Sequence, residues 1–253
     1  MKLNMFRELL IRNKVLFETV AASLLSVMAI IVSIVQTRTS SQQTEIFALQ
    51  TRIIEAQALP QFEVAIHQKR NDVTEKFDDN LLVVKNNGGA VHNFYEDSAY
   101  FFCISAEIPG VGFREIKVPI GGYFISSAVS SAGTGDLVTT FGFHNNASFI
   151  NLYHQTRQAA TAKKWPHVLI NEQTVVHLRY RDLLDRQHED YYDVSHVGAG
   201  MRMLDLDGKL LFDKWRIIPR LELSTLNAED LLTIVAQAKD GKGCQSSGAE
   251  YPP

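Results

Sequence analysis

The sequence predicts a mainly β protein, with an N-terminal transmembrane helix and a helical stalk followed by an antiparallel β-sandwich or barrel-like domain with one or two accessory helices. Three observations lead to this fold class. An apolar run fills residues 15–35, a heptad-like pattern continues from it to residue 59, and short alternating stretches separated by turn signals follow Pro60. We therefore divide the chain into a basic N-terminus at 1–14, a transmembrane helix at 15–36, a stalk at 37–59, a β-rich globular domain at 60–240 and a disordered tail at 241–253.

The apolar run is long enough to be a membrane anchor. A helix rises 1.5 Å per residue, so about 20 residues cross a hydrocarbon core of roughly 30 Å. A cleaved signal peptide has a shorter apolar core and a small-residue cleavage site, which the sequence after residue 35 lacks. Glu18 lies one turn inside the run and four residues after Lys14, which favours an interfacial ion pair over an intramembrane proton site. The sequence predicts an uncleaved signal anchor in the lipid bilayer.

The basic residues around the anchor predict its orientation. Four precede the run and two follow it within a comparable distance: Lys2, Arg7, Arg12 and Lys14, against Arg38 and Arg52. Because Lys and Arg are enriched on the cytoplasmic side of membrane helices, we expect a cytoplasmic N-terminus and an extracytoplasmic domain.

Small and apolar residues along the anchor and stalk indicate self-association. Ala22 and Ser26 form a small-xxx-small pair that permits close helix approach, and Ile46, Leu49 and Ile53 continue a 3,4 apolar repeat. The alternative is a monomeric amphipathic stalk, because the convincing repeat covers only about two heptads.

Beyond Pro60 the apolar period changes from helical to two, which is typical of strands. Strands are expected at 62–66, 81–85, 100–106, 113–120, 123–129, 137–143, 175–181, 188–194, 201–206 and 210–218. Helices are expected at 145–164 and at 227–239, where Asn227 supplies an N-cap. The stretch from Asp205 to Lys209 resembles the start of a calcium loop but lacks its later ligands, so we predict a hairpin turn at Asp207-Gly208.

Composition excludes several functions. A net charge of −3, with 21% charged residues and no basic stripe, argues against nucleic-acid binding. The two cysteines, Cys103 and Cys244, show no metal-binding spacing, and we do not expect them to form a disulfide. No nucleophile elbow, phosphate loop or dinucleotide fingerprint is present, so no cofactor and no catalytic residue are predicted. Aromatic residues concentrate between 94 and 153, mostly for the core, with an aromatic-lined site as the alternative.

The segment from 175 to 196 predicts a charged hairpin. Depending on register, Arg179 pairs with Asp190 or Arg181 pairs with Glu189 across it. The candidate partner-binding surface comprises His177, Arg179, Arg181, Glu189, Asp190 and Asp193. A metal held by His177, Asp193 and His196 is the alternative, but charged pairs on a solvated face are commoner, so no bound metal is expected.

Three motifs resemble a loose group of uncharacterised bacterial single-pass membrane proteins. They are Leu59-Pro60-Gln61-Phe62 after a Gln-rich stalk, LLVVKNNGGAVHNF, and LRYRDLLDRQHEDYYDV. The resemblance covers the anchor and about half of the domain. It implies a β-sandwich beside the bacterial inner (plasma) membrane and carries no catalytic residues.

These observations favour a non-enzymatic, signal-anchored protein whose β domain binds a partner or ligand. The first alternative is a membrane-tethered effector or sensor with a cytoplasmic ligand-binding domain, in defence or stress signalling. The second is a metal-dependent hydrolase built on His and Asp residues. Orientation of the anchor separates the first two, because they place the domain on opposite sides of the membrane.

Overall fold

The computed structural model describes residues 11–195 and 198–238. Its contacts divide the chain into two compact units, Met1–Ala56 and Gln57–Pro253. The predicted disordered tail, Cys244, His196 and the first basic residues lie outside the described residues.

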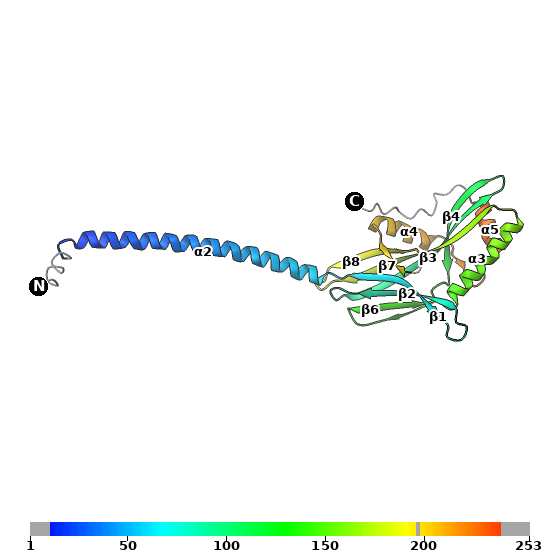
Figure 1. The fold of residues 1–253 in the computed structure, drawn as a ribbon, viewed down its shortest axis with the longest axis horizontal. Helices are drawn as coiled ribbons and strands as arrows, with labels where there is room; N and C mark the ends of the chain where they lie inside the picture. The colour runs from blue at the N-terminus through cyan, green and yellow to red at the C-terminus, as the bar shows by residue number, and fades with distance from the viewer. Residues whose placement is uncertain (1–10, 196–197, 239–253) are drawn as a thin grey trace. The chain divides into compact units, whose positions relative to one another are not determined.

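In its described residues, the first unit is built on one long helix, as predicted. Helix α2 (Lys14–Ala58) is unbroken, none of its residues is buried, and it is long and apolar enough to cross a membrane (Figure 1). Lys14 Nζ lies 3.7 Å from Glu18 Oε1, so the expected ion pair is present. The hydroxyl groups of Thr19, Ser23 and Ser26 donate to carbonyl groups one turn earlier in the helix, that of Ser26 to Ala22 at 2.9 Å. These three hydroxyl groups therefore need no partner outside the helix, which suits a lipid environment.

We predict that the full chain self-associates through this helix. Ile46, Leu49 and Ile53 are each more than half exposed, so the predicted seam is open to a second copy. Changing all three to Ser should shift the crosslinked full-length protein in detergent from oligomer to monomer, because the apolar seam is lost. The matched control changes Phe47 and Ile54, which are equally exposed but lie off the seam. Identical crosslinking of the seam variant and the wild type would rule out the stalk as the interface.

The second unit contains two mostly antiparallel sheets that do not close into a barrel, which confirms the predicted fold class (Figure 1). Sheet A has the strand order β5 (Ser126–Val129), β6 (Gly135–Phe141), β2 (Phe77–Asn86), β1 (Phe62–Arg70) and β9 (Gly198–Ala199). Sheet B has the order β10 (Met201–Arg202), β8 (Gln187–Val194), β7 (His167–Arg181), β3 (His92–Ile108), β4 (Gly112–Gly121) and β11 (Leu221–Glu222). The pairing of β11 with β4 is parallel, and every other pairing is antiparallel.

Strand β3 is longer than predicted: the expected strand at 100–106 lies in the C-terminal half of a 17-residue strand. It pairs with β7 from His92 to Glu107, but with β4 only from Tyr100 onward. Residues 92–99 of β3 therefore extend past the end of β4, and β4 does not pair with them.

Apolar residues on the two faces of sheet B build separate parts of the core. Val176 and Leu178 of β7 face sheet A, where they pack with Leu82 and Val84 of β2. Val175 points to the opposite face, where it packs with Phe212. Because successive residues of a strand alternate between faces, both faces of β7 are buried along its centre.

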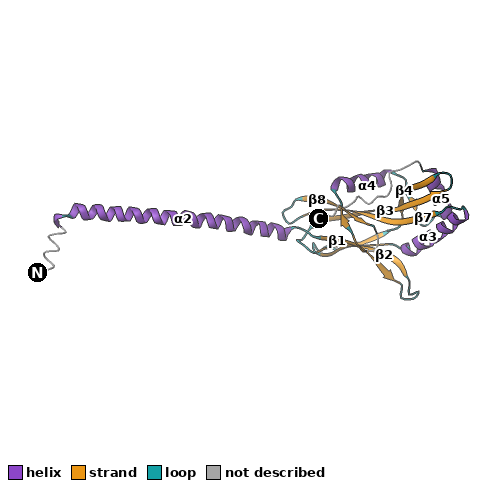
Figure 2. Ribbon diagram, turned by 45° about the horizontal axis from the view of Figure 1, so that its top comes forward, coloured by secondary structure: helices purple, strands orange, loops and turns teal. Residues whose placement is uncertain are grey.

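Three helices cover the sheets (Figure 2). Helices α3 (Asn145–Ala162) and α5 (Ala228–Gln237) confirm the two predicted helices. Helix α3 contacts β2 and β7, α5 contacts β3 and β4, and Leu152 and Leu231 belong to one core cluster. The Asn227 side chain caps α5 by accepting a hydrogen bond from the Asp230 N–H at 2.9 Å. The third helix, α4 (Asp205–Ile217), lies on the face of sheet B that points away from sheet A.

Helix α4 corrects the sequence prediction, which placed strands at 201–206 and 210–218 and a hairpin turn between them. Only Met201 and Arg202 of this region are in a strand, and Asp207-Gly208 lies within the helix. Gly208 is where the helix backbone meets the sheet: a Cβ atom there would lie 2.3 Å from Tyr191 Cβ. This glycine therefore permits a close helix–sheet contact and not a turn.

Candidate functional site

The charged hairpin has a register that differs from both predicted alternatives. Arg179 lies opposite Glu189, whereas Asp190 lies opposite Leu178 and Arg181 opposite Gln187. The predicted pairing of Arg179 with Asp190 was wrong by one residue, and that of Arg181 with Glu189 was wrong by two. Arg179 also stacks on Tyr95, with its guanidinium carbon 4.4 Å from the ring centroid.

The six candidate surface residues divide between the two faces of sheet B. His177 is buried, stacked on Tyr191 at 4.4 Å between ring centroids, with Phe212 of α4 at its edge. Burial lowers the pKa of this imidazole, and its Nε2 lies 3.7 Å from Glu189 Oε2. Asp190 is buried on the other face, where it bonds Arg202 and accepts from Tyr180 Oη at 2.7 Å. The set therefore contains internal structural contacts as well as exposed charges.

The remaining candidates make contacts of their own. Asp193 accepts from Gln173 Nε2 at 2.6 Å and from the Ser195 hydroxyl. Arg181 forms two hydrogen bonds of 3.0 Å to Asp185, in the loop that joins β7 to β8. A partner-binding role for this hairpin stays a prediction.

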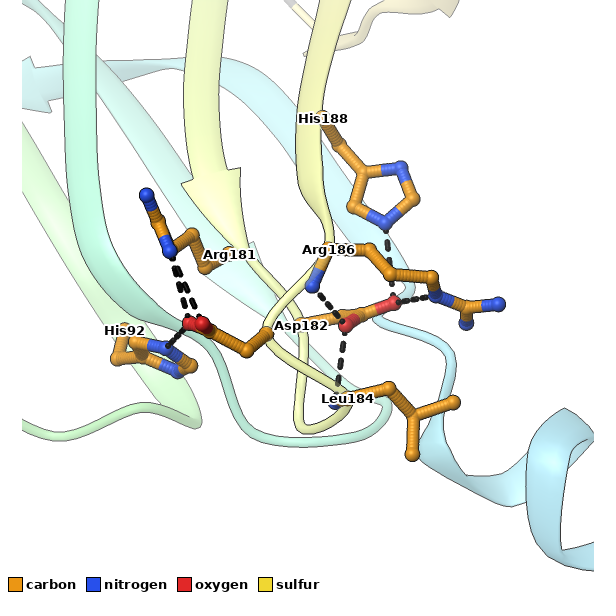
Figure 3. Close-up of polar contacts among 7 residues, drawn as sticks. His92, Arg181, Asp182, Leu184, Arg186 and His188 are labelled. Carbon is orange, nitrogen blue, oxygen red and sulfur yellow. Dashed lines mark hydrogen bonds and ion pairs between the residues drawn. The ribbon is translucent and has the colours of Figure 1, made fainter.

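The loop between β7 and β8 is organised around Asp182, which is 1% exposed (Figure 3). Its carboxylate accepts hydrogen bonds from the Leu184 and Arg186 N–H groups at 2.9 and 3.0 Å. It also accepts from Arg186 Nε at 2.7 Å and lies 3.0 Å from His188 Nε2. Burial opposes ionisation, but these contacts together lower the pKa of Asp182 far below its usual value. This ionised carboxylate fixes the turn.

Metal binding at the hairpin can be tested directly. Among residues 11–195 and 198–238, no group of three or more His, Cys, Asp or Glu side chains could hold a metal ion. Asp193 lies opposite Val175 and His177 opposite Tyr191, so the two are not direct cross-strand neighbours. We predict that elemental analysis of the purified full-length protein will find no stoichiometric zinc or manganese. Stoichiometric metal that is lost in His177→Ala or Asp193→Ala would favour the hydrolase alternative instead.

A cavity of about 300 Å³ lies beyond the end of β4, beside the edge of β3 that β4 does not cover. We call it the Glu96 cavity. Sheet A contributes Ser126, Ser127 and Thr140, and the region of α4 contributes Trp215 and Arg220. The other lining residues come from β3, β4 and the loop that follows β4: Glu96, Asp97, Ser98, Tyr100, Ile120, Gly121, Gly122, Tyr123, Phe124 and Ile125. Its volume is at the lower end of the range for small-molecule sites.

Glu96 is the chemically unusual residue of this cavity. Its Oε1 atom is buried and has no hydrogen-bond partner among the described residues, while Oε2 accepts from Thr140 Oγ1 at 3.4 Å. Burial is the main cause that raises the pKa of Glu96 to about 7. Hydrogen bonds from Ser98 and Thr140 lower this pKa, whereas the negative charge of Asp97 raises it further. Glu96 therefore changes charge near neutral pH.

Four aromatic residues contribute to the cavity lining: Tyr100, Tyr123, Phe124 and Trp215. Tyr100 and Tyr123 stack with ring centroids 3.6 Å apart, and Phe124 meets Tyr123 edge-on at 5.0 Å. Both tyrosine hydroxyls donate to Glu172 Oε1, that of Tyr123 at 2.8 Å. Burial and this carboxylate keep both tyrosine pKa values above the usual range, so both are neutral.

Two segments far apart in sequence complete the wall. Arg220 places its guanidinium 4.5 Å from the Trp215 ring centroid. Gly121 and Gly122 bring the loop backbone close to Glu222, because a Cβ at Gly121 would lie 2.4 Å from Glu222 Oε1. These two segments therefore set the shape of the cavity.

Sequence reasoning did not find this site. The one signal in the sequence is Glu96-Asp97-Ser98, three polar residues of β3 that come directly before the mostly apolar stretch at 99–104. Comparison of the chain with protein-family models, with curated proteins and with solved structures found no match.

Proposed function

We propose that this protein is a non-enzymatic, membrane-anchored binding protein whose β domain takes a small ligand in the Glu96 cavity. One observation carries the proposal: a cavity of about 300 Å³ combines aromatic side chains with the half-buried carboxyl group of Glu96, whose Oε1 has no hydrogen-bond partner in the described chain. An unpartnered buried polar atom costs about 1–3 kcal/mol, and a bound donor group would recover that cost. Polar groups that converge on one cavity fix the orientation of a ligand, and Glu96, Ser98 and Thr140 converge here.

The proposed anchor is the apolar half of α2, with the N-terminus in the cytoplasm and the β domain outside, at the bacterial inner membrane. The excess of basic residues before the apolar run supports this orientation. A periplasm-active reporter fused after Pro253 should be active, and a cytoplasm-active reporter should be silent. The reverse pattern would favour the tethered cytoplasmic effector or sensor, with the same ligand site.

Ligand binding in the cavity can be tested by filling it. Ser127 is exposed on β5 and lines the cavity, so Ser127→Trp should occupy the space with little effect on the core. Val129 lies two residues along the same strand, is exposed and does not line the cavity, so Val129→Trp is the matched control. We would screen a chemically diverse fragment panel against the full chain in nanodiscs by thermal shift.

Fragments that stabilise the wild type and Val129→Trp but not Ser127→Trp would support the proposal. The proposal fails if no fragment binds, or if every bound fragment is indifferent to Ser127→Trp. A chromogenic hydrolase panel on the same sample tests the enzymatic alternative.

A further inference from the structure

We infer that the Glu96 cavity selects a small organic cation, whose primary amine or guanidinium group donates to the Glu96 carboxylate. This inference rests on the proposed function, because it names the chemical class of the ligand for the same site. Its evidence is the pattern of charges around the cavity and the nature of its walls.

Glu96 differs from the two buried aspartates of the domain, Asp182 and Asp190, in what it contacts. Asp182 is paired with Arg186 and His188, and Asp190 is paired with Arg202. Glu96 forms no ion pair with any residue in the described ranges, and its polar contacts are hydroxyl groups. A buried carboxylate without a cation is costly to ionise, so the site lacks one positive charge.

The other charged groups near Glu96 form no ion pair with it in the described ranges, and their own contacts differ. Asp97, its neighbour on β3, bonds Arg216 of α4 at 3.1 Å. Arg220, at the end of the α4 segment, lies over Trp215. On β7, His177 lies opposite Asp97 and burial keeps the imidazole pKa low. Thr140 of β6 and the two neutral tyrosines add no charge, and Glu222 of β11, beside Gly121, is a further acid.

The cavity walls also favour a cation over an anion. A cation near the face of an aromatic ring gains about 0.5–2 kcal/mol, and the half-buried Phe124 lines the cavity, where Trp215 already has the Arg220 guanidinium over its ring. An anion would be attracted by Arg220 but repelled by the Glu96 carboxylate, to which it could donate no hydrogen bond. A neutral alcohol can donate to Glu96 but leaves the ionised carboxylate without a counter-charge. Cation binding is therefore the arrangement that satisfies both the hydrogen bond and the charge.

Three four-carbon probes separate these classes: putrescine, 1,4-butanediol and succinate. We would measure their binding calorimetrically to the full chain in phosphatidylcholine nanodiscs, because zwitterionic lipid limits amine binding to the membrane. Putrescine should bind at pH 8 at least tenfold more tightly than the diol, and succinate should not bind. Because ionised Glu96 is the binding form and its pKa is about 7, putrescine affinity should fall about tenfold between pH 8 and pH 6.

Variants assign the effect to one carboxyl group. Glu96→Gln should weaken putrescine binding at least tenfold and abolish the pH dependence. Glu107→Gln is the control, because Glu107 lies on the same strand, is exposed and is outside the cavity lining. If Glu96→Gln fails to fold, the wild-type pH profile and the relative affinities of the three probes still show whether the cavity selects a cation.

The possible failures are distinguishable. Equal binding of the diol and putrescine, or binding of succinate, overturns the cation class, and so does no binding of putrescine. The proposed function survives each of these results if the fragment screen yields ligands that Ser127→Trp displaces. If that screen also yields none, the cavity is not a ligand site and both proposals fail.

Discussion

Gly208→Ala is expected to destabilise the β domain by about 2–3 kcal/mol, the cost of overpacking at a tight contact. A Gly→Ala change inside a helix usually increases stability, because Ala is favoured over Gly there by about 1 kcal/mol. The opposite is expected here because of the contact with β8: the added Cβ would lie 2.3 Å from Tyr191 Cβ and 2.4 Å from its Cγ. Helix α4 must then move away from the sheet, and its Phe212 loses burial.

Urea unfolding of the full chain in detergent, followed by tryptophan fluorescence, measures this change, since Trp215 lies on the same helix. Lys209→Ala is the control, because Lys209 is exposed one residue further along α4. A Gly208→Ala protein as stable as the control, or more stable, would show that α4 does not pack closely on Tyr191.

Asp182→Asn is expected to lower the free energy of unfolding by about 2–3 kcal/mol at pH 7, because a buried, ionised acceptor of several hydrogen bonds is replaced by a neutral amide. The effect depends on pH. The folded-state pKa of Asp182 is lowered, so its contribution is fully present above the unfolded-state pKa of about 3.9. It is lost progressively as pH falls below that value. Wild type and variant should therefore converge in stability in acid.

Asp185→Asn is the matched control for this loop. Asp185 also contacts an arginine and a histidine, Arg181 and His92 (Figure 3), but it is exposed, so solvent screens its ion pairs and Asp185→Asn should change stability much less than Asp182→Asn. Its φ of 61° is a left-handed conformation that Asn also tolerates. Equal destabilisation by the two variants, or a difference that persists at low pH, would contradict the role assigned to Asp182.

The sequence predicted the elements whose signals are local. The unbroken α2 follows from 45 residues without Gly or Pro, and α5 begins at a capping Asn. Helix α4 was missed because a Gly after an Asp is typical of a hairpin turn, and because apolar residues from 201 to 206 alternate by accident. Its helical period is visible afterwards in Gly208, Phe212 and Trp215, which face the sheet at intervals of four and three.

The site and the hairpin register depend on information that is not local. A shift of one residue changes every cross-strand partner, and the register between β7 and β8 is fixed by the loop around Asp182. The polar residues Glu96-Asp97-Ser98 were not enough to identify a site, because the burial of Glu96 comes from β6 and from the point where β4 ends, more than 20 residues away in sequence. Partners that approach from distant segments cannot be read from residue spacing.

Strand β3 also determines how the domain unfolds. It contributes Phe102 and Ile104 to the core under α3 and α5, Phe101 to the core under α4, and Phe94 to the space between the sheets. No layer can separate from the others without exposing part of this strand. We therefore expect the amides at the centre of β3 to exchange with solvent only through global unfolding, so that the domain melts as one cooperative unit.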